Sequence, residues 1–227
     1  FNLMQARLRR FVDDRTSMLA AISHDLMTPI SRLRLRAEAL PAGEDRARML
    51  ADLDLMDRMV AATLDFARDD VAAERRQRLD LASLVQAICD ECGADESDGV
   101  ERARYLGPDY LEIVAAPLAL SRALRNVMEN AVKYGGRAEV VLGLGSAGAE
   151  IAVCDAGPGI PEAELDRVFE PFYRLDRARD AGGSGLGLAI ARNVLRAHGG
   201  EISLENLPGG GLRARLTLPL SPAGRVS

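Results

Sequence analysis

The 227-residue sequence has no long hydrophobic run. A transmembrane helix needs about 18 to 20 consecutive apolar residues, and these residues contain neither such a stretch nor a signal-peptide pattern. The first residue, Phe1, already reads as part of a helix, so we interpret the chain as an excerpt whose upstream part is missing. Cysteine is scarce as well, and the odd number of three favours a reducing compartment over a disulfide framework.

An excess of basic residues is also lacking. Lysine and arginine total 29 against 34 acidic residues, a net charge of -5, which argues against a nucleic-acid-binding function. The charged segment at residues 74–78 could be a DNA-binding arm, but it carries no recognition motif, and we interpret it as a hinge. Cys89 and Cys92 form a lone C-x-x-C, which favours buried small side chains over a zinc or redox site.

Two helices with heptad-like apolar spacing are predicted in the first third of the chain. The first covers residues 1–40, with a bend at Pro29, and Pro-Ala-Gly at 41–43 separates it from a second that begins with the acidic pair at 44–45. Both have apolar residues at steps of three and four: Leu19, Ile22, Leu26, Ile30, Leu33, Ala37 and Leu40, then Met49, Leu53, Met56, Val60, Leu64, Ala67 and Val71. A hairpin alone cannot enclose both stripes, so we expect a four-helix bundle made by two copies of the chain. Packing against the later domain is the alternative.

His24 falls off this apolar seam. Asp25 and Thr28 lie on the same side of the helix, because positions i+1 and i+4 stay within about a quarter of the helical circle. An unperturbed histidine titrates near ~6.5, so its imidazole is largely neutral at cytoplasmic pH and can act as a nucleophile. The alternative is an ordinary surface histidine.

From Leu79 onward, short alternating runs are interleaved with helical segments. This pattern predicts an α+β fold with a mostly open sheet, with strands at residues 110–114, 138–144, 150–154, 201–204 and 212–220. One helix is expected from Pro117 to Tyr134, ended by two glycines. Another should follow Gly187 and read through Arg196.

A row of polar residues is expected on the first of these two helices, at Arg122, Asn126, Asn130 and Lys133. An amide carbonyl can supply a neutral oxygen to Mg²⁺, and a lysine can supply charge to a phosphate. The row therefore suits a metal-phosphate group, although exposed polar faces are common.

Two glycine-rich stretches suit a nucleotide. Asp155 follows a predicted strand and precedes Gly157 and Gly159, so a carboxylate could accept an exocyclic amine where a flat ring has room to approach. The stretch 183–187 (Gly-Ser-Gly-Leu-Gly) leads into a helix, whose unpaired N–H groups can cradle phosphate. It lacks the strand and the spacing of a dinucleotide fingerprint. Between the two, residues 169–174 supply aromatics and an arginine that could equally pack in the core.

In this order the motifs resemble those of the sensor histidine kinases of two-component systems, over about Phe11 to Leu220. The stretches similar to the family's motifs are the H box at residues 23–29, the N box at 126–134, G1 at 155–159, the F box at 169–174 and G2 at 183–187. The first helix is most similar to the EnvZ-type osmosensor subgroup. The resemblance implies a dimerisation and histidine-phosphotransfer hairpin at 1–75, which forms a dimeric four-helix bundle. It also implies a catalytic ATP-binding α/β sandwich of the GHKL (Bergerat) type at 76–227.

The resemblance also implies residue roles. His24 would be phosphorylated, Asp25 would orient or deprotonate it, and Thr28 would position water for dephosphorylating the regulator. Asn130 would hold Mg²⁺, with Asn126 assisting nearby. Other ATP contacts would come from Lys133, Tyr134, Asp155, Gly157, Gly159, Arg174, Gly183, Ser184, Gly185, Leu186 and Gly187.

Two positions depart from the family pattern. Met27 stands where many relatives carry a basic residue, which leaves the contacts to the regulator and the phosphatase balance open. Ser184 stands where threonine is common, and that change is conservative.

The resemblance implies an ATP- and Mg²⁺-dependent protein histidine kinase. It would phosphorylate its own histidine, pass the phosphoryl group to an aspartate of a response-regulator receiver domain, OmpR-like, and dephosphorylate that regulator. The partners would be a second copy of the chain and the regulator, with no nucleic acid. The chain would be the cytoplasmic portion of a bacterial inner-membrane protein, anchored through a segment absent here.

Two other functions compete with this one. A gyrase- or Hsp90-like ATPase would need a catalytic acid where the chain has Asn126, and the hairpin has no place in it; Glu129 is the nearest acid. A catalytically inactive dimerising scaffold would not need complete nucleotide motifs.

Overall fold

The computed structural model describes five stretches of the chain: residues 26–67, 74–93, 102–146, 148–175 and 183–220. They form two compact units. The first contains residues 26–67 together with 174–175 and 183–186, and the second contains the other described residues. None of the described helices is long and apolar enough to cross a membrane.

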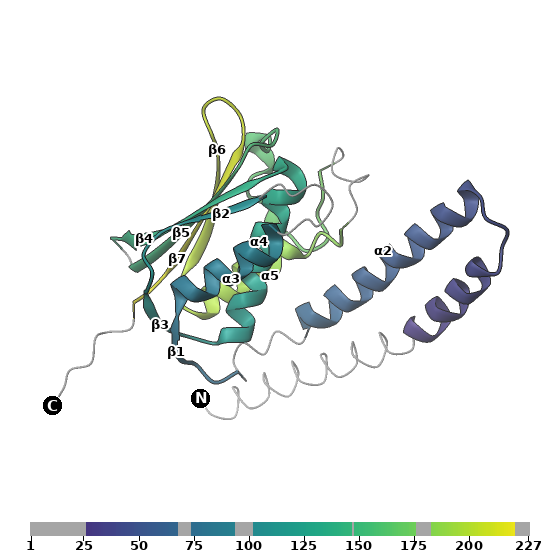
Figure 1. Cartoon of the computed structure of the whole chain (residues 1–227), viewed down its shortest axis with the longest axis horizontal. Coiled ribbons are helices and arrows are strands. Elements are labelled where there is room, and N and C mark those ends of the chain that lie inside the picture. Colours follow the sequence, from purple (N-terminus) through teal and green to yellow (C-terminus); the bar gives the residue numbers. More distant parts are fainter. Residues whose placement is uncertain (1–25, 68–73, 94–101, 147, 176–182, 221–227) are drawn as a thin grey trace. The chain divides into compact units, whose positions relative to one another are not determined.

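The first unit contains the predicted helical hairpin (Figure 1). A helix covers residues 26–38, and α2 follows over Glu44–Ala67, with Glu44 and Asp45 in its first turn. Ile30 and Ala37 of the first helix pack with Leu53 of α2, and Leu50 and Val60 flank this small core. Arg34 pairs with both Asp54 and Asp57, so an ion-pair network also joins the two helices.

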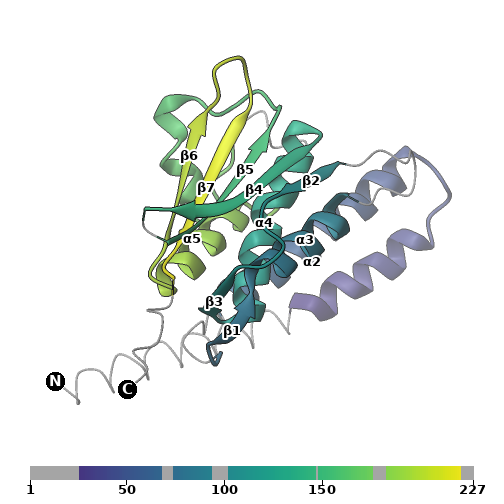
Figure 2. The ribbon, with the colours of Figure 1, turned by 60° about the vertical axis from the view of Figure 1, so that its left-hand side comes forward.

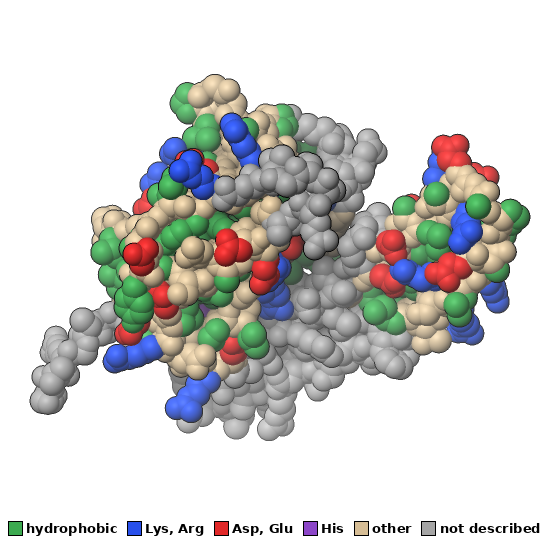
Figure 3. Space-filling model, in the orientation of Figure 1, with side chains coloured by type: hydrophobic (Ala, Val, Ile, Leu, Met, Phe, Trp, Pro, Cys, Tyr) green, Lys and Arg blue, Asp and Glu red, His purple; other side chains and the backbone are tan. Residues whose placement is uncertain are grey.

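The hairpin buries only part of its apolar seam. Leu33 stays 45% exposed and Met56 stays 48% exposed, whereas Ile30 and Ala37 are buried. Over the described part of α2, acidic and basic side chains lie next to apolar ones on the same surface (Figure 3). One copy of the hairpin therefore leaves apolar surface uncovered, as the spacing predicts.

The second unit is built on a five-stranded sheet with the strand order β2-β4-β5-β7-β6 (Figure 2). The strands are β2 (Ala103–Leu106), β4 (Ala138–Gly145), β5 (Gly148–Asp155), β6 (Glu201–Asn206) and β7 (Leu212–Leu218). Only β2 and β4 run parallel. A separate pair, β1 (Gln77–Asp80) and β3 (Glu112–Ala115), is antiparallel. The sequence analysis did not predict β1 or β2.

Three helices cover one face of the sheet: α3 (Leu81–Gly93), α4 (Pro117–Gly135) and α5 (Gly187–Ala197) (Figure 2). Beneath them, Leu142, Ile151, Leu216 and Ile202 lie in register across four strands, and all four are buried. Two short 3-10 turns, η1 (Glu162–Glu164) and η2 (Arg167–Phe169), precede α5. The result is the expected two-layer α/β sandwich.

The ends of α3 and α4 follow from particular residues. Asp80 caps α3, because Oδ1 accepts the N–H of Ala82 at 3.1 Å while Oδ2 accepts the hydroxyl of Ser83. The hydrogen bond from Ser83, together with others from backbone N–H groups, lowers the pKa of Asp80. At the end of α4, Gly136 has a φ of 75° and donates to the carbonyl of Val132, so the predicted glycine stop is confirmed.

The C-x-x-C pair lies on α3. Cys89 is buried, and burial raises the pKa of its thiol to about 12. At neutral pH this thiol stays protonated, whereas redox chemistry and zinc binding need a thiolate. The packing role that the sequence analysis favoured fits this environment.

We expect Gly200→Ala to destabilise the second unit. A Cβ at Gly200 would lie 1.9 Å from the carbonyl oxygen of Thr217, so the start of β6 would have to move away from β7. The cost should be at least about 2 kcal/mol, as for other overpacked sites, measured by urea unfolding.

Gly143→Ala is the matched control, because nothing lies within 4 Å of a Cβ built there. It should change the unfolding free energy by less than about 0.5 kcal/mol. Equal losses in the two variants would contradict the close approach at Gly200.

Candidate functional site

The predicted polar row lies on α4. The apolar face of that helix is buried, at Leu120, Leu124, Val127 and Ala131. On the other side Asn126 and Asn130 are half-buried and Lys133 is exposed. The predicted separation of the two faces is confirmed.

Asn126 carries an unusual amide. Its Nδ2 atom is buried, and no described residue offers it a hydrogen-bond partner. A buried polar atom without a partner costs about 1 to 3 kcal/mol, so such atoms in folded proteins usually mark a functional role or an unseen ligand. Gly187, the first residue of α5, lies beside this side chain: a Cβ built there would be 3.5 Å from Asn126 Oδ1.

Asp155 ends β5 and organises the turn that follows. Its Oδ1 accepts the N–H of Gly157 at 2.8 Å and that of Leu212 at 3.2 Å. Both hydrogen bonds go to Oδ1, and Oδ2 takes part in neither of them. A carboxylate held in this way at a strand end can receive an amine donor from a ligand.

The C-terminal end of α4 lies directly against this turn. A Cβ at Gly135 would be 2.5 Å from the Cβ of Asp155, and one at Gly157 would be 2.8 Å from the carbonyl oxygen of Tyr134. Glycine is therefore required at both positions. The backbone of Tyr134 therefore lies at the turn formed by Asp155 and Gly157, and its side chain is 40% exposed.

The sequence analysis missed Asn206, which holds the same loop from β6. Its Oδ1 accepts the N–H of Ile160 at 2.8 Å, and its Nδ2 donates to the carbonyl of Ile160 at 2.7 Å. Gly159 beside it has a φ of 68°. Gly211 was missed as well: its φ is 102°, and a Cβ there would lie 2.2 Å from the carbonyl oxygen of Asp155. An asparagine that precedes a Pro-Gly-Gly-Gly turn is the only sequence signal for this clamp.

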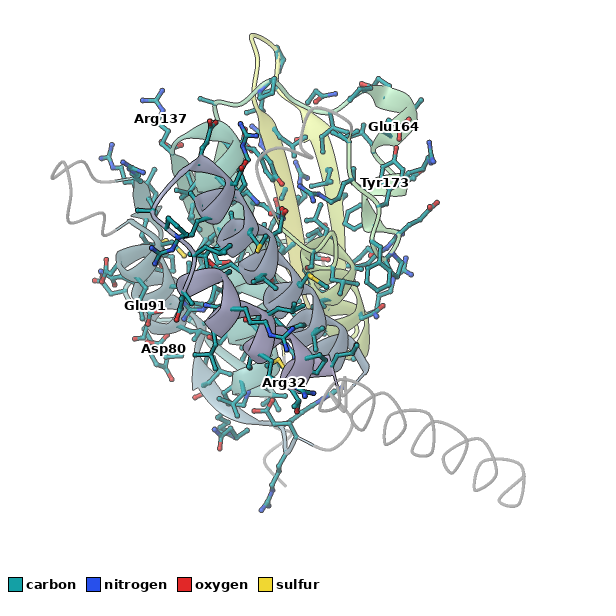
Figure 4. The ribbon with its side chains drawn as sticks, turned by 90° about the vertical axis from the view of Figure 1, so that its right-hand side faces the viewer. Arg32, Asp80, Glu91, Arg137, Glu164 and Tyr173 are labelled. Atoms are coloured by element: carbon teal, nitrogen blue, oxygen red, sulfur yellow. The ribbon has the colours of Figure 1, made fainter. Side chains whose placement is uncertain are left out.

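The stretch 169–174 is divided between core and surface. Phe169 is buried, and the guanidinium of Arg192 on α5 stacks over its ring at 4.7 Å. Phe172 is 56% exposed with a φ of 66°, an unusual backbone conformation for a side chain of its size. The hydroxyl of Tyr173 donates to Glu164, and both side chains are labelled in Figure 4.

The other predicted site residues that the structure describes are divided between the two units. Lys133 Nζ lies 5.1 Å from the ring centroid of Tyr134, and Arg174 is half-buried. The stretch directly before α5 belongs to the first unit and consists of Gly183, Ser184, Gly185 and Leu186. Within it, Ser184 Oγ accepts the N–H of Leu186 at 3.4 Å. Thr28 is exposed on the first helix. His24 and Asp25 lie outside the described residues.

The site can be tested for its fit to a nucleotide and a metal. The unpaired amide of Asn126, the carboxylate of Asp155 and the helix start at Gly187 suit a purine nucleotide with its phosphates. Among the described residues, no group of three or more His, Cys, Asp or Glu could hold a metal ion. The amide oxygens of Asn126 and Asn130 could serve Mg²⁺, because this ion is commonly held by few protein ligands together with substrate phosphates and waters.

Two family models match the chain. Residues 115–222 match the histidine kinase-, DNA gyrase B- and HSP90-like ATPases, and residues 14–71 match the His Kinase A (phospho-acceptor) domain. Sensor histidine kinase GtrS of Pseudomonas aeruginosa is 41% identical over 96% of this chain and 45% of its own length. Sensor histidine kinase CpxA of Escherichia coli is 33% identical over 97% of this chain and 50% of its own length. The chain spans about half the length of these relatives.

Two solved structures have a similar fold. Full-length ShkA, in complex with AMPPNP, superposes with a TM-score of 0.70 at 24% identity, over 92% of this chain and 47% of its own, which shows the shared fold. A mycobacterial sensor histidine kinase, MprB, has a TM-score of 0.55 at 29% identity, over 65% of this chain and 99% of its own.

The family match over residues 115–222 assigns the second unit to the class of histidine kinase-, DNA gyrase B- and HSP90-like ATPases. With the phospho-acceptor domain ahead of it, the chain belongs to the sensor histidine kinases.

We expect Asn206→Ala to release the loop at Ile160, because both of its hydrogen bonds to that residue are lost. The amide of Ile160 should exchange with solvent at least about fivefold faster, measured by NMR. Asn193→Ala, at an exposed position on α5, should leave this rate unchanged. A slow amide in Asn206→Ala would show that the loop is held by other contacts.

Proposed function

We propose that this chain is the catalytic portion of a sensor kinase that transfers the γ-phosphoryl group of ATP to His24 and from there to an aspartate of a receiver domain. The observation that carries the proposal is a pair of contacts along α4: the Asn126 amide lies beside Gly187 at the start of α5, and the C-terminal end of α4 at Gly135 lies against the turn at Asp155. The two family models that match this chain support it, as does its similarity to sensor histidine kinases. Residues 1–75 would be the phosphotransfer hairpin and 76–227 the catalytic domain.

In this proposal the nucleotide binds across α4, the turn after β5 and the start of α5. Asp155 Oδ2 accepts the exocyclic amine of adenine, Tyr134 covers the ring, and Gly157 and Gly159 leave room for it. Asn130 binds Mg²⁺ with Asn126 beside it, and Mg²⁺ when bound neutralises phosphate charge. The phosphates are contacted by Lys133, Arg174 and the stretch Gly183, Ser184, Gly185, Leu186 and Gly187. ShkA was solved with the ATP analogue AMPPNP, which supports a nucleotide here.

The residues of the hairpin would do the chemistry. One ring nitrogen of His24 attacks the γ-phosphorus, a P–N bond forms, and the bond to the bridging oxygen of ADP breaks. Asp25 holds the other ring nitrogen in the required tautomer and takes up its proton. The phosphoryl group then passes to the carboxylate of the receiver. Such transfer depends on positioning and charge neutralisation.

The partners follow from the same proposal. The exposed apolar residues of the hairpin, Leu33, Leu35, Met49 and Met56 among them, would be covered by a second copy in a four-helix bundle. The regulator would be OmpR-like. The whole protein would be anchored in the bacterial inner membrane by a segment outside these 227 residues, as a sensor whose catalytic portion is cytoplasmic.

A gyrase- or Hsp90-like ATPase is the less favoured function. Its catalytic acid would have to be Glu129, which is exposed and three positions from Asn126 on α4. Three positions are about 60° around the helix, and Glu129 is exposed whereas the Asn126 amide is buried.

We expect the wild-type chain, incubated with labelled ATP and Mg²⁺, to gain a label that is stable in base and labile in acid. His24→Ala should lose the label while ATP binding, measured by calorimetry, stays within about twofold, because the nucleotide motifs lie on other segments. Retention of the acid-labile label in His24→Ala would exclude His24 as the acceptor. Absence of any label in the wild type would favour the inactive scaffold.

Thr28→Ala should separate two activities. Thr28 is exposed one helical turn from position 24, so its hydroxyl could order a water beside a docked phospho-aspartate, but it has no part in the attack on ATP. We expect Thr28→Ala to keep self-phosphorylation and to dephosphorylate purified phospho-regulator at least about tenfold more slowly. Asp25→Ala should instead lose self-phosphorylation.

Two results would refute this role of Thr28. One is dephosphorylation at the wild-type rate in Thr28→Ala. The other is a wild type without phosphatase activity, which the exposed Met27 at the regulator-facing position could cause.

A further inference from the structure

Glu74 lies in the segment that joins the hairpin to β1, yet it contacts the start of α4. Its Oε1 accepts the N–H of Leu118 at 2.8 Å, and its Oε2 accepts the N–H of Ala119 at 2.9 Å. Pro117 at the first position of the helix has no N–H, and the N-cap residue Ala116 has no capping side chain. Glu74 therefore supplies, from 44 residues away, the negative cap that the helix's own sequence lacks.

Arg76 makes the complementary contact on α5. Its guanidinium donates to the carbonyl of Ala197, the last residue of that helix. A positive charge is favourable there, because the carbonyls at a helix C-terminus carry partial negative charge. Two residues of the linker, of opposite charge, thus contact the ends of two neighbouring helices.

His198 joins these two helix ends to each other. The side chain is buried, its Nε2 accepts the N–H of Ala116 at 2.9 Å, and its Nδ1 lies 2.8 Å from the carbonyl oxygen of Val194. A neutral ring with its proton on Nδ1 satisfies both contacts. The N-terminus of α4 and the C-terminus of α5 are therefore held together under the linker.

The helix pair extends from this point to the candidate nucleotide site. The helices are antiparallel, since Ala116 meets His198 at one end and Asn126 meets Gly187 further along. Ten residues of α4 correspond to about 15 Å. A linker docked at one end is thus attached to the same two helices that form the site at the other.

We propose that Glu74 and Arg76 form a linker clasp, which docks the linker on α4 and α5 and restrains phosphoryl transfer to His24. The restraint on phosphoryl transfer rests on the proposed function. With the clasp closed, the connection from Ala67 ends at residue 74. With the clasp open, it extends to Gln77 at the start of β1, three residues or up to about 10 Å further. The encounter of tethered groups depends on the length of the connection between them, so we expect the longer connection of the open clasp to accelerate transfer.

The clasp itself is tested by amide exchange in the full chain without nucleotide. In Glu74→Ala the amides of Leu118 and Ala119 should exchange at least about fivefold faster, as expected for the loss of a helix cap. Arg75→Ala is the matched control, because Arg75 is the exposed neighbour between the two clasp residues; it should leave both amides unchanged. Unchanged exchange in Glu74→Ala overturns the clasp.

The restraint is tested by self-phosphorylation kinetics of the same variants. Glu74→Ala and Arg76→Ala should each raise kcat about threefold or more, with the KM for ATP within about twofold of the wild type. Arg75→Ala should change neither. An unchanged or lower kcat overturns the restraint. A raised KM for ATP also counts against it, because the two residues would then only maintain the structure of the nucleotide site. A wild-type chain that binds no ATP would refute the proposed function, while amide exchange would still decide the clasp.

Discussion

The antiparallel pairing of α4 with α5 is the constraint on which the rest of the second unit depends. At one end, the buried ring of His198 accepts the N–H of Ala116. Loss of that contact would leave a buried donor unpaired, at a cost of about 1 to 3 kcal/mol. At the other end, Gly187 brings the start of α5 against Asn126. The two halves of the candidate site, far apart in sequence, are thus fixed in one arrangement.

Close backbone approach then sets the geometry around Asp155. Gly135, Gly157 and Gly211 all lie where a Cβ would clash with the turn at Asp155 or with the end of α4. The space that they leave allows the N–H groups of Gly157 and Leu212 to reach a single carboxylate oxygen. Because that oxygen is fully engaged, the direction in which the other one accepts a hydrogen bond is fixed before any ligand arrives.

Local patterns in the sequence were sufficient for the hairpin, for the faces of α4 and for β4 and β5, because each has a clear apolar period. They were insufficient for β1 and β2, which have four residues each and carry charged side chains. The first helix ends at residue 38, two residues before its predicted end. Its seam residues Leu26 and Leu33 are 45% exposed in the single chain. The spacing identifies an apolar stripe without saying what covers it.

In the second unit, the residues that the sequence failed to predict share a physical property. Asn206 contacts a residue 46 positions away, and His198 contacts one 82 positions away. No local period records such contacts, because each depends on tertiary structure that places two segments side by side. Candidate binding residues, such as Asp155 and the amides of α4, can be recognised from type and spacing. Residues that hold those groups in place become visible only in the fold.

The short segment before α3 contacts the ends of three helices. Within seven residues, Glu74 caps the start of α4, Arg76 binds the end of α5, and Asp80 caps the start of α3. Each charge has the sign that the helix dipole favours at that end. All three helices that cover the sheet therefore have an end satisfied by one segment, which also forms the connection to the hairpin. A displacement of this connection would remove stabilising contacts from α4 and α5 at once, so the linker and these two helices are energetically coupled through their ends.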